Sequence, residues 1–189
     1  MQDLKPAFLL FLAFTVICGG LYPAVVTGIG QTVFPKQANG SFLTDATGSM
    51  VGSALLGQPF TAPQYFWPRP SATAGFAYNP LASGGSNAGP SNPAYLQIVA
   101  DRVEALRASG VTGTLPADLV QASSSGLDPH VSPAAASLQV PRVAKARGLD
   151  EARVAALVAT HTEGRQFGFL GEPRVNVLAL NLELDRLRP

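Results

Sequence analysis

A long uncharged stretch near the amino terminus is the strongest constraint on what this sequence can fold into. No Asp, Glu, Lys, Arg or His occurs between Lys5 and Lys36, and apolar residues dominate from Ala7 to Val33. About 20 apolar residues are enough to cross the hydrocarbon core of a bilayer. The sequence therefore predicts a transmembrane helix with its flanks over residues 1–34, in contact with lipid, and a soluble domain over residues 35–189.

A cleaved signal peptide is the alternative interpretation of this stretch. Such a peptide has a basic start, a shorter apolar run and a small-residue cleavage site. Here Asp3 lies close to Lys5, and Cys18 follows Ile17 rather than the small residue of a lipoprotein processing site. These features favour a helix that the mature chain retains.

Gly19, Gly20 and Pro23 interrupt the apolar stretch at mid-depth. A spanning helix tolerates such residues when a neighbouring helix packs closely or satisfies the freed backbone groups. Two interpretations stay open: the span docks against another membrane protein at these residues, or the residues kink an ordinary anchor.

The orientation of the span is weakly encoded. Lys5 and the amino terminus stand at one end, and Lys36 alone stands at the other. Because positive residues near a span favour the cytoplasmic side, the count predicts a cytoplasmic amino terminus and a soluble domain outside.

The charge and cysteine content exclude several classes of protein. Thirteen Lys and Arg against twelve Asp and Glu give a net charge of +1, far from the basic excess of a nucleic-acid-binding chain. Cys18 is the only cysteine, which excludes an intramolecular disulfide and a cysteine-based zinc site. We therefore expect no nucleic-acid partner and no metal site.

The soluble part has two differently built halves. Between residues 37 and 100 the only charges are Asp45 and Arg69, and seven prolines between Gly57 and Pro93 leave short strands and ordered loops instead of long helices. Large aromatic residues such as Trp67 argue against a disordered linker. The fold class we predict is a single transmembrane helix plus a mixed α+β soluble domain, with a loop-rich N-terminal layer and a helical C-terminal half.

Helix starts mark the C-terminal half. Capping residues at Asn92, Ser132 and Asp150 each precede a helical apolar pattern. Pro141 is expected to kink or split the second of these helices. The last segment, residues 175–187, fits either a helix or a strand, because its apolar residues satisfy both periodicities.

Catalytic motifs are weak in this sequence. No Walker-type loop and no Asp-Lys-Thr-Gly occurs, so ATP hydrolysis would belong to another chain. The run from Ser123 to His130 contains the residue types of a serine hydrolase, but neighbours on a tight turn do not readily form a relay and no Gly-x-Ser-x-Gly elbow is present. A membrane-tethered hydrolase that uses Ser125 or its neighbours remains the alternative function. His161 is expected at a helix end, and the loop 81–87 is either an anion-binding loop or a plain one.

Several blocks, taken in collinear order over the whole chain, resemble one family: the KdpC subunits of the Kdp high-affinity potassium-transporting P-type ATPase. The blocks are residues 19–23, 37–41, 52–58, 65–72, 78–80, 83–87, 122–128, 139–147, 175–178 and 180–182.

This resemblance implies a non-catalytic subunit of a bacterial inner-membrane complex for potassium uptake. Its partners would be a potassium-conducting subunit, a P-type subunit that hydrolyses ATP with magnesium, and a small stabilising subunit. Members of that family are described as catalytic chaperones that raise the affinity of the pump subunit for ATP in a transient ternary complex. No cofactor bound by this chain alone is implied.

The resemblance also implies site residues. The glutamine of the chaperone proposal matches Gln139, and Arg142 lies one helical turn further, so both side chains could contact one nucleotide; alternatively they belong to an ordinary helix surface. If the soluble domain lies outside, however, any effect on ATP has to be a coupling carried through the membrane subunits. The residues that we expect at interfaces with other subunits are Gly19, Gly20, Pro23, Tyr65, Phe66, Trp67, Arg69, Asn79 and Asn87.

Overall fold

The computed structural model describes residues 3–187. Its contacts divide the chain into one unit that ends at Phe42 and a second that begins at Leu43. Residues 35–42 fall in the first of these units, and the domain boundary after residue 34 stays a prediction.

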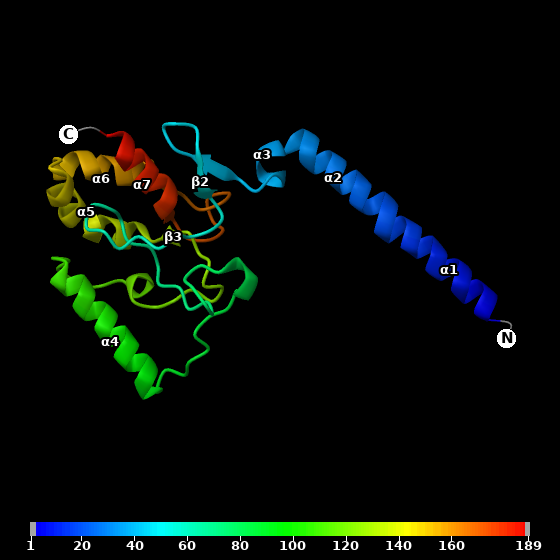
Figure 1. Ribbon diagram of the computed structural model, residues 1–189, viewed down its shortest axis with the longest axis horizontal. Coiled ribbons are helices and arrows are strands. Elements are labelled where there is room, and N and C mark those ends of the chain that lie inside the picture. Colours follow the sequence, from blue (N-terminus) through cyan, green and yellow to red (C-terminus); the bar gives the residue numbers. More distant parts are fainter. Residues whose placement is uncertain (1–2, 188–189) are drawn as a thin grey trace. The chain divides into compact units, whose positions relative to one another are not determined.

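The first unit is dominated by a long apolar helix (Figure 1). The long helix consists of α1 (Leu4–Val16), the π-helical turn η1 (Ile17–Leu21) and α2 (Tyr22–Val33). The short helix α3 (Pro35–Ala38) follows it. From Leu4 to Val33 the helix is long and apolar enough to cross a membrane, and it is the one such helix among the described residues. The prediction of an amino-terminal transmembrane helix is confirmed.

The glycines and proline at mid-span change the hydrogen bonding without breaking the helix. Tyr22 donates its backbone N–H to the carbonyl of Ile17, five residues earlier, which is the π-helical pattern. Pro23 has no N–H to give to Gly19, so a wider turn at this point accommodates the proline ring.

Two small antiparallel sheets follow the apolar helix along the chain. The two-stranded sheet pairs β1 (Phe42–Thr44) with β2 (Met50–Ser53). The three-stranded sheet has the order β3-β5-β4, formed by His130–Val131, Arg174–Asn176 and Thr162–Glu163 respectively. Val175 lies opposite both Val131 and Thr162, so β5 is the central strand.

The predicted helix caps are confirmed. Asn92 caps α4 (Pro93–Ala108), Ser132 caps α5 (Pro133–Arg147) and Asp150 caps α6 (Glu151–Thr160), each through a side-chain oxygen that accepts backbone N–H groups. α5 runs on across Pro141, so of the two predicted outcomes the split is excluded and the kink stays a prediction.

The ambiguous last segment is both a strand and a helix. Asn176 ends β5 and at once caps α7 (Val177–Arg186), with no loop between them. Only the helix alternative holds for residues 177–186, and the strand covers the residues just before it.

Ordered loops dominate residues 57–92, where the structure has η2 (Pro80–Ala82) and no strand. A further short turn, η3 (Ala117–Leu119), follows α4. The expected short strands are absent from this range because its backbone groups bond to side chains of distant elements, as described below.

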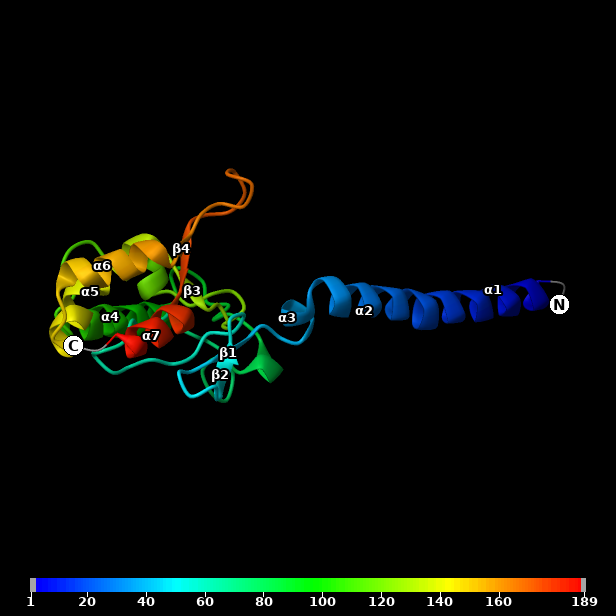
Figure 2. The same ribbon diagram turned by 90° about the horizontal axis from the view of Figure 1, so that it is seen from above.

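The core of the second unit lies among α5, α6, α7 and the central strand, which Figures 1 and 2 show grouped together. Its fully buried members come from every one of these elements and from one loop residue. They are Phe66, Ala135, Ala136, Val143, Val154, Val175, Leu180 and Leu184.

Candidate functional site

An extended loop segment, residues 63–67, is held between α5 and α7 by side chains, and we call it the clamped segment. Phe66 inserts its ring into the core with none of its surface exposed. Its backbone N–H donates to Oδ1 of Asn181 at 2.9 Å, and its carbonyl accepts from Nδ2 of the same residue at 3.0 Å. One side-chain amide on α7 thus satisfies both backbone groups of Phe66.

Gln139, on α5, likewise bonds both backbone groups of the next loop residue, Trp67. The N–H of Trp67 donates to Gln139 Oε1 at 2.8 Å, and the Trp67 carbonyl accepts from Nε2 at 3.1 Å. Nε2 also donates to the carbonyl of Ala135 at 3.2 Å. Gln139 is fully buried, so its amide bonds only to groups of this chain, which are the backbone of Trp67 and Ala135 and the side chain of Arg142.

Arg142 completes the clamp. Its guanidinium donates to the carbonyls of Pro63 at 2.6 Å and Tyr65 at 3.1 Å, and to Oε1 of Gln139 at 2.6 Å. The guanidinium carbon also lies 4.3 Å from the centre of the Trp67 ring, a cation–π contact. Arg142 is 7% exposed, and its Nε has no hydrogen-bond partner among residues 3–187.

Burial of the Arg142 guanidinium has a free-energy cost. Desolvation lowers the pKa of Arg142 to about 10, because the surroundings disfavour the charged form. Three oxygen acceptors and an aromatic face offset part of that cost.

The two nucleotide-contact candidates are therefore brought together, but around a protein segment. Gln139 and Arg142 share one hydrogen bond and point into the clamp, not to solvent. The sequence carries a signal for the burial of Gln139, because this residue lies three or four positions from the apolar Ala135, Ala136 and Val143.

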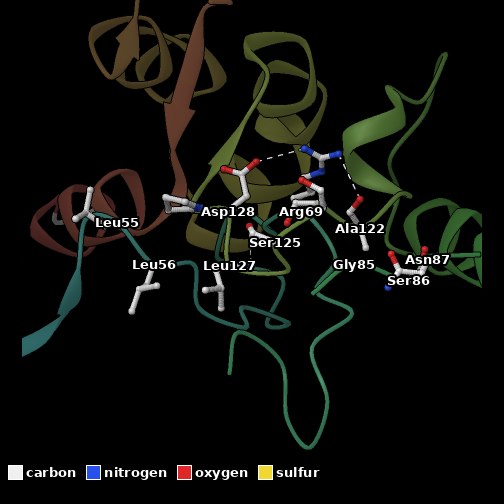
Figure 3. Close-up of a pocket in the computed structure, with 13 residues that line it drawn as sticks. Leu55, Leu56, Arg69, Gly85, Ser86, Asn87, Ala122, Ser125, Leu127 and Asp128 are labelled. Carbon is white, nitrogen blue, oxygen red and sulfur yellow. Dashed lines mark hydrogen bonds and ion pairs between the residues drawn. The ribbon is translucent and has the colours of Figure 1, made fainter. Parts of the chain in front are cut away.

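A second polar centre lies at Arg69 and Asp128 (Figure 3). The two side chains form an ion pair at 3.3 Å, and Arg69 also donates to the carbonyls of Gln121 and Ala122. Burial alone would raise the pKa of Asp128, but hydrogen bonds from His130 and the Arg69 charge outweigh it and hold the pKa below 3.8. This centre ties the loop-rich layer to the segment that leads into β3.

An open cavity of about 720 Å³ adjoins this ion pair. Asn87, which has φ of +49°, lines it together with backbone of residues 122–125. Figure 3 shows Ser86 and Asn87 on one loop and Ser125 on another. Asn79 lies outside this cavity and caps η2 by accepting from the N–H of Leu81.

The serine residues near this cavity do not form a catalytic relay. Ser123 Oγ accepts from the N–H of Gly126 and Ser125 Oγ from that of Leu127. Nδ1 of His130 lies 3.4 Å from Asp128, and among the hydrogen bonds of residues 3–187 none joins a serine hydroxyl to His130. The geometry fits a turn that leads into α5 better than it fits a nucleophile and its base.

His161 lies where the sequence placed it, at the carboxyl end of α6. Its Nδ1 is 3.0 Å from the carbonyl of Leu157, so the ring contacts the last turn of α6.

The interface candidates in the span, Gly19, Gly20 and Pro23, are exposed in this single chain. Gly19 and Gly20 lie in η1, and a Cβ added at either would meet no atom of the described chain within 4 Å. All residues from α1 through α2 except the half-buried Gly30 are exposed in this single chain. The prediction that Gly19, Gly20 and Pro23 contact another protein stays a prediction.

Several exposed apolar side chains escaped the sequence analysis. Leu81 is 94% exposed, Phe76 is 62% exposed, and Phe167 and Phe169 lie on a projecting hairpin. Exposure cannot be read from residue type alone, since the neighbouring aromatic Phe66 is buried.

Together the fold and these sites define a class: a mixed α+β domain that follows an amino-terminal membrane helix, in which buried polar side chains hold the domain's own backbone. Comparison with known proteins is more specific. The family model described as "K+-transporting ATPase, c chain" matches residues 4–186.

Curated relatives match over the full length of the chain. The chain is 66% identical to the potassium-transporting ATPase KdpC subunit of Geobacter sulfurreducens and 67% identical to that of Geobacter metallireducens, with 100% of each chain covered. It is 60% identical to the corresponding protein of Methylococcus capsulatus, again over 100% of both chains. The chain belongs to the KdpC family.

Proposed function

We propose that this chain acts as a docking and assembly subunit of an ATP-driven potassium uptake complex, without catalysis of its own. The span packs against membrane subunits through η1, and the loop-rich layer contacts the outer face of the potassium-conducting subunit. The ATP-hydrolysing subunit and the small stabilising subunit are the remaining partners.

The observation that carries this proposal is the open surface at Gly19 and Gly20. Glycine exposes backbone to close approach by another helix, and a π-helical turn inside a span is typically found at functional sites. Neither residue is needed for packing within this chain, so their flat surface is available to a second protein.

We further propose that any effect on ATP affinity is indirect. Gln139 and Arg142 spend their hydrogen bonds on the clamped segment, which supports a structural role for both. A domain outside the membrane would influence a cytoplasmic nucleotide site only as a coupling free energy through the membrane subunits.

The test is co-purification of the other subunits with a tagged full chain from detergent-solubilised membranes. Gly20→Leu leaves the chain's own fold unchanged, because the added side chain meets open space, and is expected to reduce recovery by about tenfold. Ala7→Leu is the matched control, since it adds similar bulk at another exposed position of the span. Equal recovery of both variants would contradict docking through η1.

The loop-rich layer needs a different variant. Trp67 takes part in the clamp, so Trp67→Ala would perturb the fold as well as any interface. Leu81→Ser changes a side chain that is 94% exposed and is expected to lower recovery without a change in stability. Unchanged recovery of the other subunits would show that Leu81 does not lie in the interface.

A further inference from the structure

The hairpin between β4 and β5, residues 164–173, projects from the second unit, and we call it the arm (Figure 2). Its tip carries Phe167, Phe169 and Leu170, which are 87%, 70% and 46% exposed. Single exposed apolar residues are ordinary, but three within four residues at the end of a projection are an apolar patch that needs an explanation.

The arm is ordered by its own backbone. Gln166 and Leu170 exchange two N–H···O hydrogen bonds, each of 2.9 Å, and the N–H of Phe169 donates to Gln166 at 3.2 Å. This tight turn holds the tip in one conformation before any contact is made. A preformed tip loses less conformational entropy on binding than a flexible loop does.

One tip residue has an unfavourable backbone. Phe167 has φ of +52°, a left-handed conformation that bulky side chains rarely adopt. Within this chain the ring of Phe167 gains almost no burial in return. Strain of this kind is typical of functional positions, where a side chain has to be presented in a fixed direction.

The charges of the arm and its base favour one kind of occupant. Arg165 pairs with Glu172 at 2.7 Å, and Arg174 pairs with Glu163 at 2.9 Å. Both arginines are thus neutralised by neighbours. Binding to an anionic lipid surface needs an excess of basic residues, which these four paired side chains do not supply.

We propose that the tip of the arm inserts Phe167 and Phe169 into an apolar pocket on the extramembrane surface of another subunit of the potassium-transporting ATPase. Aromatic side chains are enriched in such contacts. The inference rests on the proposed function, because it takes the occupant from the same complex, and it adds an anchor outside both the span and the loop-rich layer.

Photo-crosslinking in the intact complex identifies the occupant. p-Benzoylphenylalanine replaces Phe169 in the full chain, membranes are irradiated, and adducts are mapped by mass spectrometry. The same photo-probe at Leu96, an exposed apolar position of α4, is the control. The expected adduct joins residue 169 to an apolar segment of another subunit. An adduct with lipid, an adduct with a second copy of this chain, or a yield no higher than at position 96 would overturn the proposal.

Substitutions separate an interface role from a structural one. Phe167→Gly removes the backbone strain, so the unfolding midpoint of the purified full chain is expected to stay or rise, while association with the complex weakens by about tenfold. Phe169→Ala is expected to weaken association similarly, and Leu96→Ala is the control. Association unchanged in both arm variants would overturn the proposal.

The two proposals fail in different ways. If the unmodified chain does not co-purify with the ATPase, the proposed function and the arm both fail. If it co-purifies and only the arm variants behave like the control, the proposed function stands and the arm inference alone is wrong.

Discussion

The side-chain amides of Gln139 and Asn181 provide the backbone hydrogen bonds that a neighbouring β-strand would otherwise provide. Each primary amide offers one acceptor and two donors, so it can bond both the N–H and the carbonyl of a single residue. Two such amides, one on α5 and one on α7, satisfy Phe66 and Trp67 without any neighbouring strand. Buried backbone groups have to find partners, and here helices provide them.

Gln139→Leu tests this arrangement. The variant leaves both backbone groups of Trp67 and the Arg142 guanidinium short of partners inside the core, which we expect to destabilise the soluble unit by about 3 kcal/mol. Urea unfolding of the full chain in detergent, followed by the fluorescence of Trp67, the only tryptophan, measures the change. Gln97→Leu on exposed α4 is the control, with an expected change below about 0.5 kcal/mol. Equal stability of the two variants would mean that Gln139 is free to serve another role.

Asp128 makes the stability of the soluble unit depend on pH. Its pKa is lowered in the folded state, so its stabilising contribution is complete above the unfolded value of 3.8 and is lost as pH falls through the folded value. Asp128→Asn should therefore cost about 1 kcal/mol at pH 7 and progressively less below pH 4. Urea unfolding at several pH values measures the difference, with Asp101→Asn as the exposed control. A cost for Asp128→Asn that stays constant into acid would contradict the assignment.

At the scale of the elements, α5 tolerates a proline in its interior. Pro141 has no N–H to donate to the carbonyl of Ser137, and both residues lie on the exposed side of the helix, where water can reach that carbonyl. The buried side carries the residues that contact the clamped segment. Tertiary packing thus overrides a local preference against helix.

Pro141→Ala restores the missing hydrogen bond and is expected to stabilise the soluble unit by about 1 to 3 kcal/mol. Thermal unfolding followed by circular dichroism gives the change in midpoint. Ala134→Pro, in the first turn of the same exposed face, is the comparison, since proline is tolerated there. A loss of stability in Pro141→Ala would show that the proline itself contributes packing.

Helix starts were predictable because they depend on few neighbouring residues. Asn92, Ser132 and Asp150 each cap the next turn through local bonds, so the sequence alone indicated them. The apolar span was predictable for the same reason, since a long uncharged run needs no tertiary information.

The sheet and the clamp were not predictable in this way. Strands of two or three residues carry almost no periodicity, and β3, β4 and β5 come from separate parts of the chain. Trp67, whose backbone Gln139 binds, lies 72 residues away. Helical spacing indicates that Gln139 faces the core, but nothing local identifies the backbone that it binds. The exposure of Phe167 likewise follows only from the projection of the arm.

For the whole molecule, the side of the membrane that holds the soluble unit decides between direct and indirect effects on ATP. Cys18 is the only cysteine, so Cys18→Ala with Thr112→Cys places one thiol at an exposed position after α4. Labelling of intact cells with a membrane-impermeant maleimide is expected to be as complete as labelling after lysis. Protection that disappears only on lysis would place the unit in the cytoplasm and would reopen direct nucleotide contact.

The order of elements along the chain also governs when the soluble unit can fold. Among the elements of residues 3–187, the central strand β5 and the adjoining α7 are synthesised last. In this part of the chain β3 and β4 are joined by β5 alone, and Asn181 holds Phe66 from α7. Until the ribosome has passed Leu184, the earlier elements lack the partners that close their core. The core of the soluble unit therefore closes late in synthesis, and a chain whose core is still open is in a state that can be threaded through a translocation pore.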